Sequence, residues 1–396
     1  MEQNFIKKLK KFSLNPKTIL IVYILLAIGA GIHSYLIGPQ MFAGRLYTHY
    51  NNYMTFKHSF IHLIQNKDLY IEYPDEHWDL YKYSPTFALF MAPFYYLPNL
   101  LGLILWDLIN SMILYIAIKS LQIDERAKSL ILWFIAIELL TSIQNEQSNG
   151  LVAGLLILAF AMFEKDKPFL ATLFISISAY VKIFGILGFI LILFYPKKFK
   201  AISYSIFWMI IFALLPLVVI SPSQLKFLYI RWFELLRWDY SESAGLSVMG
   251  WLISWFKLNP PKNLVVIIGA VIFLIPLLNF KSYENFIFRL TFLASILIWV
   301  VIFNHKAESP TYVIAISGVA IWYFAQKRKI ENLALLIFAF IFTSLSPTDL
   351  FPKFLRDSLV IPYVLKAVPC IFIWFKLSYD LIFKKLEPRL DDGFVN

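Results

Sequence analysis

Charged residues and cysteines are scarce in this chain of 396 residues. Only 15% of the residues are charged, whereas 59% are hydrophobic, and the mean hydropathy is +0.68. About a quarter of the residues of a typical soluble protein are charged. This chain has too few charged residues to cover a surface that faces water, so most of its surface must face lipid. The single cysteine, Cys370, excludes an intramolecular disulfide and a cysteine-based metal site. We therefore expect an all-α integral membrane protein.

The sequence also lacks the motifs of nucleotide-dependent enzymes. It contains no Walker A, G-x-G-x-x-G or G-x-S-x-G motif. A membrane enzyme without these motifs must draw its activated substrate from the membrane, and we therefore expect a polyprenyl-phosphate donor. The formal net charge of +11 does not indicate a nucleic-acid partner, because the lysines and arginines form short clusters between apolar runs, where they set membrane topology.

These basic clusters predict the course of the chain through the membrane. Five lysines precede the apolar run 18–37, which is long enough to cross a bilayer core of about 30 Å. We interpret this run as a retained first helix rather than a signal peptide. The positive-inside rule then places a segment 1–17 and a tail 379–396 in the cytoplasm, in keeping with a bacterial inner (plasma) membrane. Between them we expect one membrane domain, 18–378, with about 11–13 transmembrane helices.

Two segments allow two topological assignments. In the first, residues 84–98, with three prolines, form an interfacial or re-entrant piece of the first outer loop. Residues 169–194 then form a pair of short broken helices that meet near Lys182. In the second, both segments are ordinary spans, and two basic loops lie outside. We favour the first assignment because it keeps every basic loop in the cytoplasm.

Most acidic and histidine residues fall in segments that both assignments place on the outer face, so we expect functional chemistry there. The first outer loop, 38–99, contains apolar residues at helical spacing between Thr55 and Ile64, which predict an amphipathic helix on the membrane. His58 and His62 have a spacing that can bind metal, but no glutamate lies between them. We interpret them as polar-face residues at the interface, and we expect no metal to be required.

Several polar residues are candidates for chemistry. Glu72, Asp75 and Asp79 can supply a general base, although solvated loop carboxylates look the same in a sequence. Six consecutive polar residues, 144–149, are costly in lipid unless they line a cavity or reach water. Lys182 lies in apolar sequence, where a lysine costs about 3 kcal/mol; it either extends to the surface or neutralises a phosphate.

Two further outer segments contain candidate residues. The second amphipathic segment, 221–262, includes Arg231 and Arg237, which suit anionic headgroups or a lipid phosphate. His305 and Glu308 lie in a polar outer turn that can line a cavity.

The chain resembles glycosyltransferase family 87 of the GT-C superfamily over roughly residues 20–330. The spacing that this family shows after its first helix is matched by Asn52, Phe56, the turn 66–68, Leu69-Tyr70 and the block 81–85. Residues 144–149 resemble its Gly-Gln-x-Asn turn without the glycine, and residues 179–182 resemble the lysine that ends a later helix. The resemblance implies a GT-C-like helix bundle whose first outer loop forms an interfacial lid over the active site.

The resemblance also implies a function. It indicates an inverting transferase that moves a hexose, mannose-like, from a polyprenyl-phosphate donor to a lipid or glycan acceptor on the outer face. Lys182, with Arg231 or Arg237, would hold the phosphate, and Asn52 and Gln144 would orient sugar hydroxyls. The remaining expected binding residues are Asn145, Asn149, His305 and Glu308.

One departure from the family concerns the general base. The family's aspartate falls at Asn52, and an amide cannot accept the proton of an acceptor hydroxyl. Either Glu72, Asp75 or Asp79 takes over, or the chain is a non-catalytic member that binds polyprenyl phosphate. A third alternative is a lipid-linked saccharide transporter, which needs charged residues along a central path. The charged residues within spans are few: Asp107, Glu138, Lys182, Arg289 and Lys366.

Overall fold

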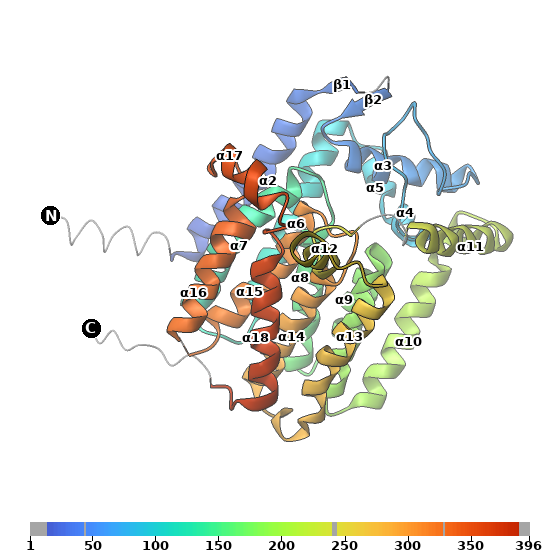
Figure 1. The fold of residues 1–396 in the computed structure, drawn as a ribbon. Helices are drawn as coiled ribbons and strands as arrows, with labels where there is room; N and C mark the ends of the chain where they lie inside the picture. Colours follow the sequence, from blue (N-terminus) through green and yellow to red (C-terminus); the bar gives the residue numbers. More distant parts are fainter. Residues whose placement is uncertain (1–13, 43–44, 240–243, 328, 388–396) are drawn as a thin grey trace. The chain divides into compact units, whose positions relative to one another are not determined.

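A computed structural model of the protein describes residues 14–42, 45–239, 244–327 and 329–387 (Figure 1). The chain forms two compact units that alternate along the sequence. The loop unit comprises Ile21–Ser120 and Leu140–Glu242, and it contains the first outer loop. The terminal unit comprises Met1–Leu20, Leu121–Leu139 and Ser243–Asn396.

The described elements of the loop unit are helices and one short antiparallel pair of strands, β1 and β2, in which Gln40 lies opposite Tyr47. Helix α2 enters this unit from the terminal unit at residue 21. The elements are α2 (Pro16–Ile37), β1 (Pro39–Phe42), β2 (Arg45–Thr48), α3 (Asn51–Ile64), α4 (Pro85–Phe90), α5 (Ala92–Tyr95), α6 (Asn99–Ser120), α8 (Asn149–Glu164), α9 (Pro168–Val181), η1 (Ile183–Phe194), α10 (Lys198–Leu214), η2 (Leu215–Val218) and α11 (Pro222–Asp239).

The elements of the terminal unit, in the part that the structure describes, are all helices joined by loops and turns. Helix α7 belongs to it as far as Leu139. Its elements are α7 (Glu125–Ile143), α12 (Val248–Phe256), α13 (Lys262–Leu274), η3 (Ile275–Leu278), η4 (Phe280–Ser282), α14 (Phe286–Ile302), η5 (Ser309–Thr311), α15 (Tyr312–Phe324), α16 (Ile330–Ala339), η6 (Phe340–Leu345), α17 (Lys353–Leu355), η7 (Arg356–Val360) and α18 (Val368–Phe383).

The helices have the length and surface of membrane segments. Among the described residues, three helices are long and apolar enough to cross a bilayer: Pro16–Ile37, Asn99–Ser120 and Lys198–Val218. Along α10 a row of large apolar side chains is exposed, including Ile206, Ile210 and Leu214. Such a surface is stable against lipid rather than water. The prediction of an all-α membrane protein is confirmed, whereas the number of crossings and the orientation stay predictions.

Residues 169–194 form the predicted pair of short helices. Helix α9 ends at Val181, and η1 begins at Ile183 after Lys182, whose backbone is extended. Gly185 lies against Ser178 and Gly188 against Ile175, so η1 runs back along α9. At the open end of this hairpin, Lys197 pairs with Asp166 at 2.7 Å. The basic turns before and after residues 169–194 therefore lie at the same end of the hairpin, as the favoured assignment requires.

Residues 84–98 are likewise too short to form a span. Helix α4 has six residues and a length of about 9 Å, far below a bilayer core. Pro85 occupies its first turn, and the Ser84 side chain accepts a hydrogen bond from the Phe87 amide, which is a standard helix start. The Ser84 hydroxyl donates to the carbonyl of Tyr180 at 2.6 Å. Helix α4 is thus fixed beside the turn of the α9–η1 hairpin.

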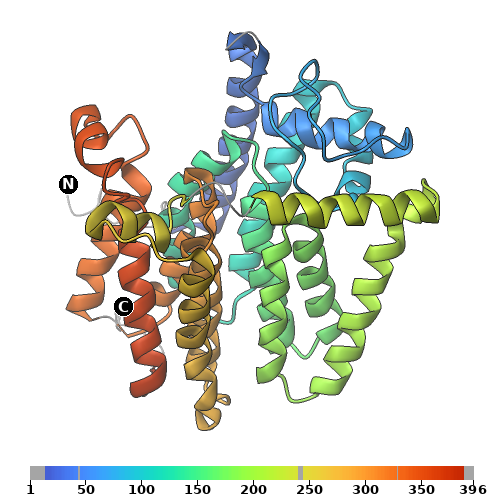
Figure 2. The same cartoon turned by 45° about the vertical axis from the view of Figure 1, so that its right-hand side comes forward.

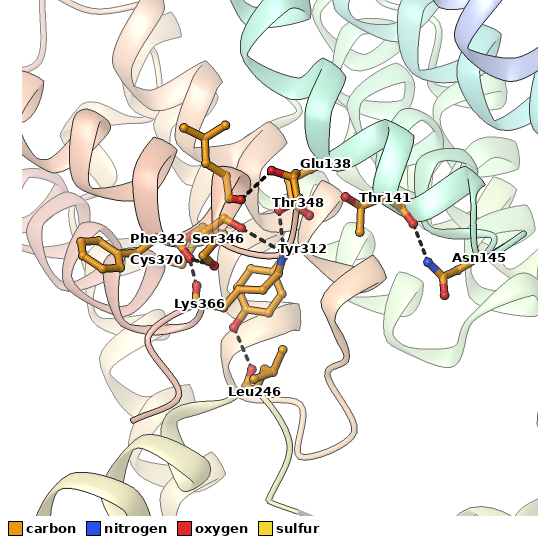
Figure 3. A network of polar contacts seen from close by, with 12 residues as sticks. Glu138, Thr141, Asn145, Leu246, Tyr312, Phe342, Ser346, Thr348, Lys366 and Cys370 are labelled. Atoms are coloured by element: carbon orange, nitrogen blue, oxygen red, sulfur yellow. Dashed lines mark hydrogen bonds and ion pairs between the residues drawn. The ribbon is translucent and has the colours of Figure 1, made fainter. Parts of the chain in front are cut away.

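A buried ion pair lies in the core of the terminal unit (Figure 3). The ammonium of Lys366 is 2.6 Å from Oε1 of Glu138, and the two side chains are 5% and 0% exposed. Lys366 also donates to the carbonyl of Thr343 at 3.0 Å and lies 5.3 Å from the ring centre of Tyr312. The pair neutralises two of the five charged residues that the sequence places within spans.

Candidate functional site

The start of helix α3 contacts a first-loop carboxylate. The side-chain amide of Asn51 donates to Oδ2 of Asp79 at 2.9 Å, and its oxygen accepts from the Trp78 amide at 2.7 Å. Asn52, the next residue, donates to the backbone carbonyl of Asn145 at 2.8 Å. Asp79 is exposed, so a substrate hydroxyl can reach it.

The polar turn 144–149 connects this carboxylate region to Lys182. The Lys182 ammonium donates to Oδ1 of Asn149 at 2.6 Å and to Oε1 of Gln147 at 3.3 Å. It also lies 5.9 Å from the ring centre of Tyr83. A cation in a cradle of amide oxygens and aromatic rings can bind a phosphate group. The loop unit therefore gathers Asn52, Asp79, Asn145, Asn149 and Lys182 from distant parts of the sequence.

Glu146 occupies the position of the missing glycine in this turn. It directly precedes Gln147 and has a backbone φ of 48°, a left-handed conformation that favours glycine. Its side chain is buried, and Trp106 donates to its backbone carbonyl at 2.8 Å. Burial raises the pKa of Glu146 well above the ordinary 4.5, although a hydrogen bond with Ser34 lowers it in part. Burial therefore favours the protonated, uncharged form of this carboxyl group.

Helix α11 lies across the end of α10 (Figure 2) and is tied to the first outer loop. Nε of Arg231 is 2.9 Å from Oδ2 of Asp68, and Nη1 is 2.9 Å from Glu234. The indole of Trp232 donates to the carbonyl of Lys82 at 3.0 Å. Arg231 thus has two carboxylates as partners, whereas Arg237 is exposed in the last turn of the helix.

The other predicted site residues are distributed as follows. Glu72 and Asp75 are exposed on the first-loop turn, and Gln144 is exposed at the end of α7. Glu308, also exposed, caps η5 together with Thr311. His305 is half-buried, and both His305 and Glu308 belong to the terminal unit. The loop-unit residues named above are therefore the ones for which the structure gives a common site.

A second polar cluster lies between α3 and the turn 73–77. Nδ1 of His58 and Nε2 of His62 lie 3.1 and 2.9 Å from Oε2 of Glu76. The ring centre of His77 is 6.2 Å from that of His58 and 6.4 Å from that of His62. Burial lowers the pKa of all three histidines, that of His62 to about 4. His62 is buried in the protein, whereas His58 is partly exposed; the position of both residues at the membrane interface stays a prediction.

The candidate site residues named from the sequence leave out four contributors to these two groups. Asn51 holds Asp79, and Gln147 contacts Lys182. Glu76 and His77 complete the cluster with the histidines of α3. Gln147 was visible as the glutamine of the Gly-Gln-x-Asn turn. Nothing in the sequence pointed to Asn51, because the resemblance to the family places the neighbouring Asn52, and not Asn51, at the position of the aspartate.

The sequence profile of glycosyltransferase family 87 matches residues 81–303, which are 223 of the 396 residues and thus more than half of the chain. The matched region contains the turn 144–149 and Lys182, whereas Asn52 and Asp79 precede it. No curated protein matches the chain. The chain belongs to glycosyltransferase family 87 and is a membrane glycosyltransferase.

Proposed function

We propose that the protein transfers a hexose, mannose-like, from a polyprenyl-phosphate donor to a lipid or glycan acceptor, with inversion at the anomeric carbon. The observation that supports this most directly lies within one unit: Asn52 and Lys182 both hydrogen bond with the turn 144–149, and Asn51, next to Asn52, holds the exposed carboxylate of Asp79. The transfer needs a base for the acceptor and a positive charge for the leaving phosphate, and the side chains of Asp79 and Lys182 supply them.

The proposed reaction is a single displacement. The acceptor hydroxyl oxygen attacks the anomeric carbon while its proton passes to the carboxylate of Asp79. The bond between the anomeric carbon and the phosphate oxygen breaks, and polyprenyl phosphate leaves with the bonding electrons. Lys182 would stabilise the charge that develops on the phosphate. Asn51 acts as a positioning residue, because its amide donates to Oδ2 of Asp79.

The other proposed binding residues are supported by different observations. Asn145 and Asn149 belong to the turn that Lys182 and Asn52 contact. Arg231 would assist only after its ion pair with Asp68 opens, so Lys182 is the preferred phosphate ligand. We propose that the reaction takes place on the outer face of the cell's plasma membrane, with both termini in the cytoplasm.

The test uses purified full-length protein in detergent with radiolabelled donors. We expect transfer from a polyprenyl-phosphate hexose and none from a nucleotide sugar. Lys182→Met removes the cation, and kcat should fall by about 10²–10³, as for other lost transition-state stabilisers. The matched control is Lys167→Met, which changes an exposed lysine at the opposite end of α9 and should leave kcat unchanged.

Two outcomes would contradict the proposal. Transfer from a nucleotide sugar would exclude the lipid-linked donor. Binding of polyprenyl phosphate without turnover of any hexose donor would identify a non-catalytic member of the family.

A further inference from the structure

We propose that His58, His62, Glu76 and His77 bind a zinc ion that joins helix α3 to the turn 73–77. The cluster contains three of the six histidines of the chain. Ligand atoms of His62, Glu76 and His77 all lie within 4.8 Å of one another. Zinc in structural sites takes four ligands, and histidine nitrogens and carboxylate oxygens are among its usual donors.

The spacing of the donor atoms suits a single ion. Zn²⁺ holds its nitrogen ligands tetrahedrally at about 2.0–2.1 Å, which separates neighbouring donor atoms by about 3.3 Å. The oxygen of Glu76 lies 2.9 Å from His62 Nε2 and 3.1 Å from His58 Nδ1. The three imidazole rings lie at nearly equal separations from one another, with ring centres 6.2 to 6.4 Å apart.

Hydrogen bonding does not account for this convergence. His58 Nδ1, His62 Nε2, His77 Nδ1 and Glu76 Oε2 are all buried, and none has a hydrogen-bond partner despite the short distances. Four buried polar atoms in one place would each cost desolvation free energy if nothing compensated them. A shared metal ion satisfies all four at once.

The surroundings hold the rings as a metal site requires. His58 and His62 are one helical turn apart and project from the same face of α3. The ring of His62 stacks on Tyr73 with ring centres 3.8 Å apart, which fixes the orientation of this ligand.

The donor set selects the metal. Three imidazoles and one carboxylate favour a borderline transition metal such as zinc, whereas Mg²⁺ and Ca²⁺ prefer oxygen ligands only. With four protein ligands the site is closed, which is typical of a structural rather than a catalytic zinc ion. The ion would fix the turn whose next residues, Trp78 and Asp79, contact Asn51.

The test measures metal content, so it does not depend on the proposed transferase activity. Full-length protein with an affinity tag that lacks histidine is exposed to Zn²⁺ in detergent, freed of excess metal and analysed by mass spectrometry. We expect about one zinc per chain, and its loss in His62→Gln and in His77→Gln. The matched control His33→Gln changes an exposed histidine on α2 and should keep the zinc.

A second measurement uses only the wild-type protein, in case the cluster variants do not fold. Added Co²⁺ should give the visible absorption of a tetrahedral site, Zn²⁺ should displace it, and a chelator should lower the unfolding temperature. Zinc content in the wild type no higher than in His62→Gln would overturn the proposal. So would a wild-type Co²⁺ spectrum without tetrahedral bands, or displacement of Co²⁺ by Mg²⁺ as readily as by Zn²⁺.

Discussion

Replacement of Gly185 by alanine tests the packing that presents Lys182. The added Cβ would lie 2.5 Å from the carbonyl carbon of Ser178 and 2.7 Å from the amide nitrogen of Ala179. Favourable contacts between carbon atoms lie at about 3.5–4.0 Å, so the overlap is about 1 Å. Because the neighbours are backbone atoms, no rotamer change can relieve it, and η1 must move away from α9.

Overpacking of this kind costs about 1–3 kcal/mol, so Gly185→Ala should unfold at a lower denaturant concentration than the wild type. The assay is urea unfolding in detergent, followed by tryptophan fluorescence. Gly29→Ala is the matched control, because nothing lies within 4 Å of a Cβ at that exposed position of α2. The reasoning would be refuted if the two variants unfolded at the same urea concentration.

Two further predictions concern buried carboxyl groups. Since burial raises the pKa of Glu146 above 4.5, the folded chain keeps a proton that the unfolded chain releases, and stability should fall as the pH rises above 4.5. The unfolding temperature of Glu146→Gln, measured across the pH range, should not show this decline. Parallel curves of unfolding temperature against pH for the wild type and the variant would contradict the prediction. Glu138→Gln leaves Lys366 buried without its anion and should cost about 3–5 kcal/mol, measured by urea unfolding. The double change Glu138→Leu with Lys366→Met should restore most of it, and a Glu138→Gln chain as stable as the wild type would refute the argument.

The hairpin of α9 and η1 could be predicted from the sequence because the basic turns before and after it determine its topology. Basic turns precede and follow residues 169–194, and an ordinary single span between them would put one turn on the wrong side of the membrane. Lys182, in the middle of this apolar run, marks the point of reversal. The structure confirms both features, because Lys197 pairs with Asp166 while Lys182 lies at the turn.

The choice among the first-loop carboxylates could not be predicted. Glu72, Asp75 and Asp79 have similar sequence surroundings, and only the path of the loop brings one of them to α3. The contact between Asn51 and Asp79 joins residues 28 positions apart, and no periodicity encodes it. The histidine cluster is a similar case, because helical spacing places His58 and His62 on one face but does not reveal that Glu76 and His77 fold onto it.

The most direct test of the account is the turnover number of Asp79→Asn. Sugar transfer from a polyprenyl-phosphate hexose is measured beside Asp75→Asn, which removes an exposed carboxylate of the same loop. Loss of a general base costs about 10²–10⁴ in rate, so kcat should fall by that factor in Asp79→Asn and stay unchanged in Asp75→Asn. Equal rates in the two variants would contradict the assignment of Asp79 as the base.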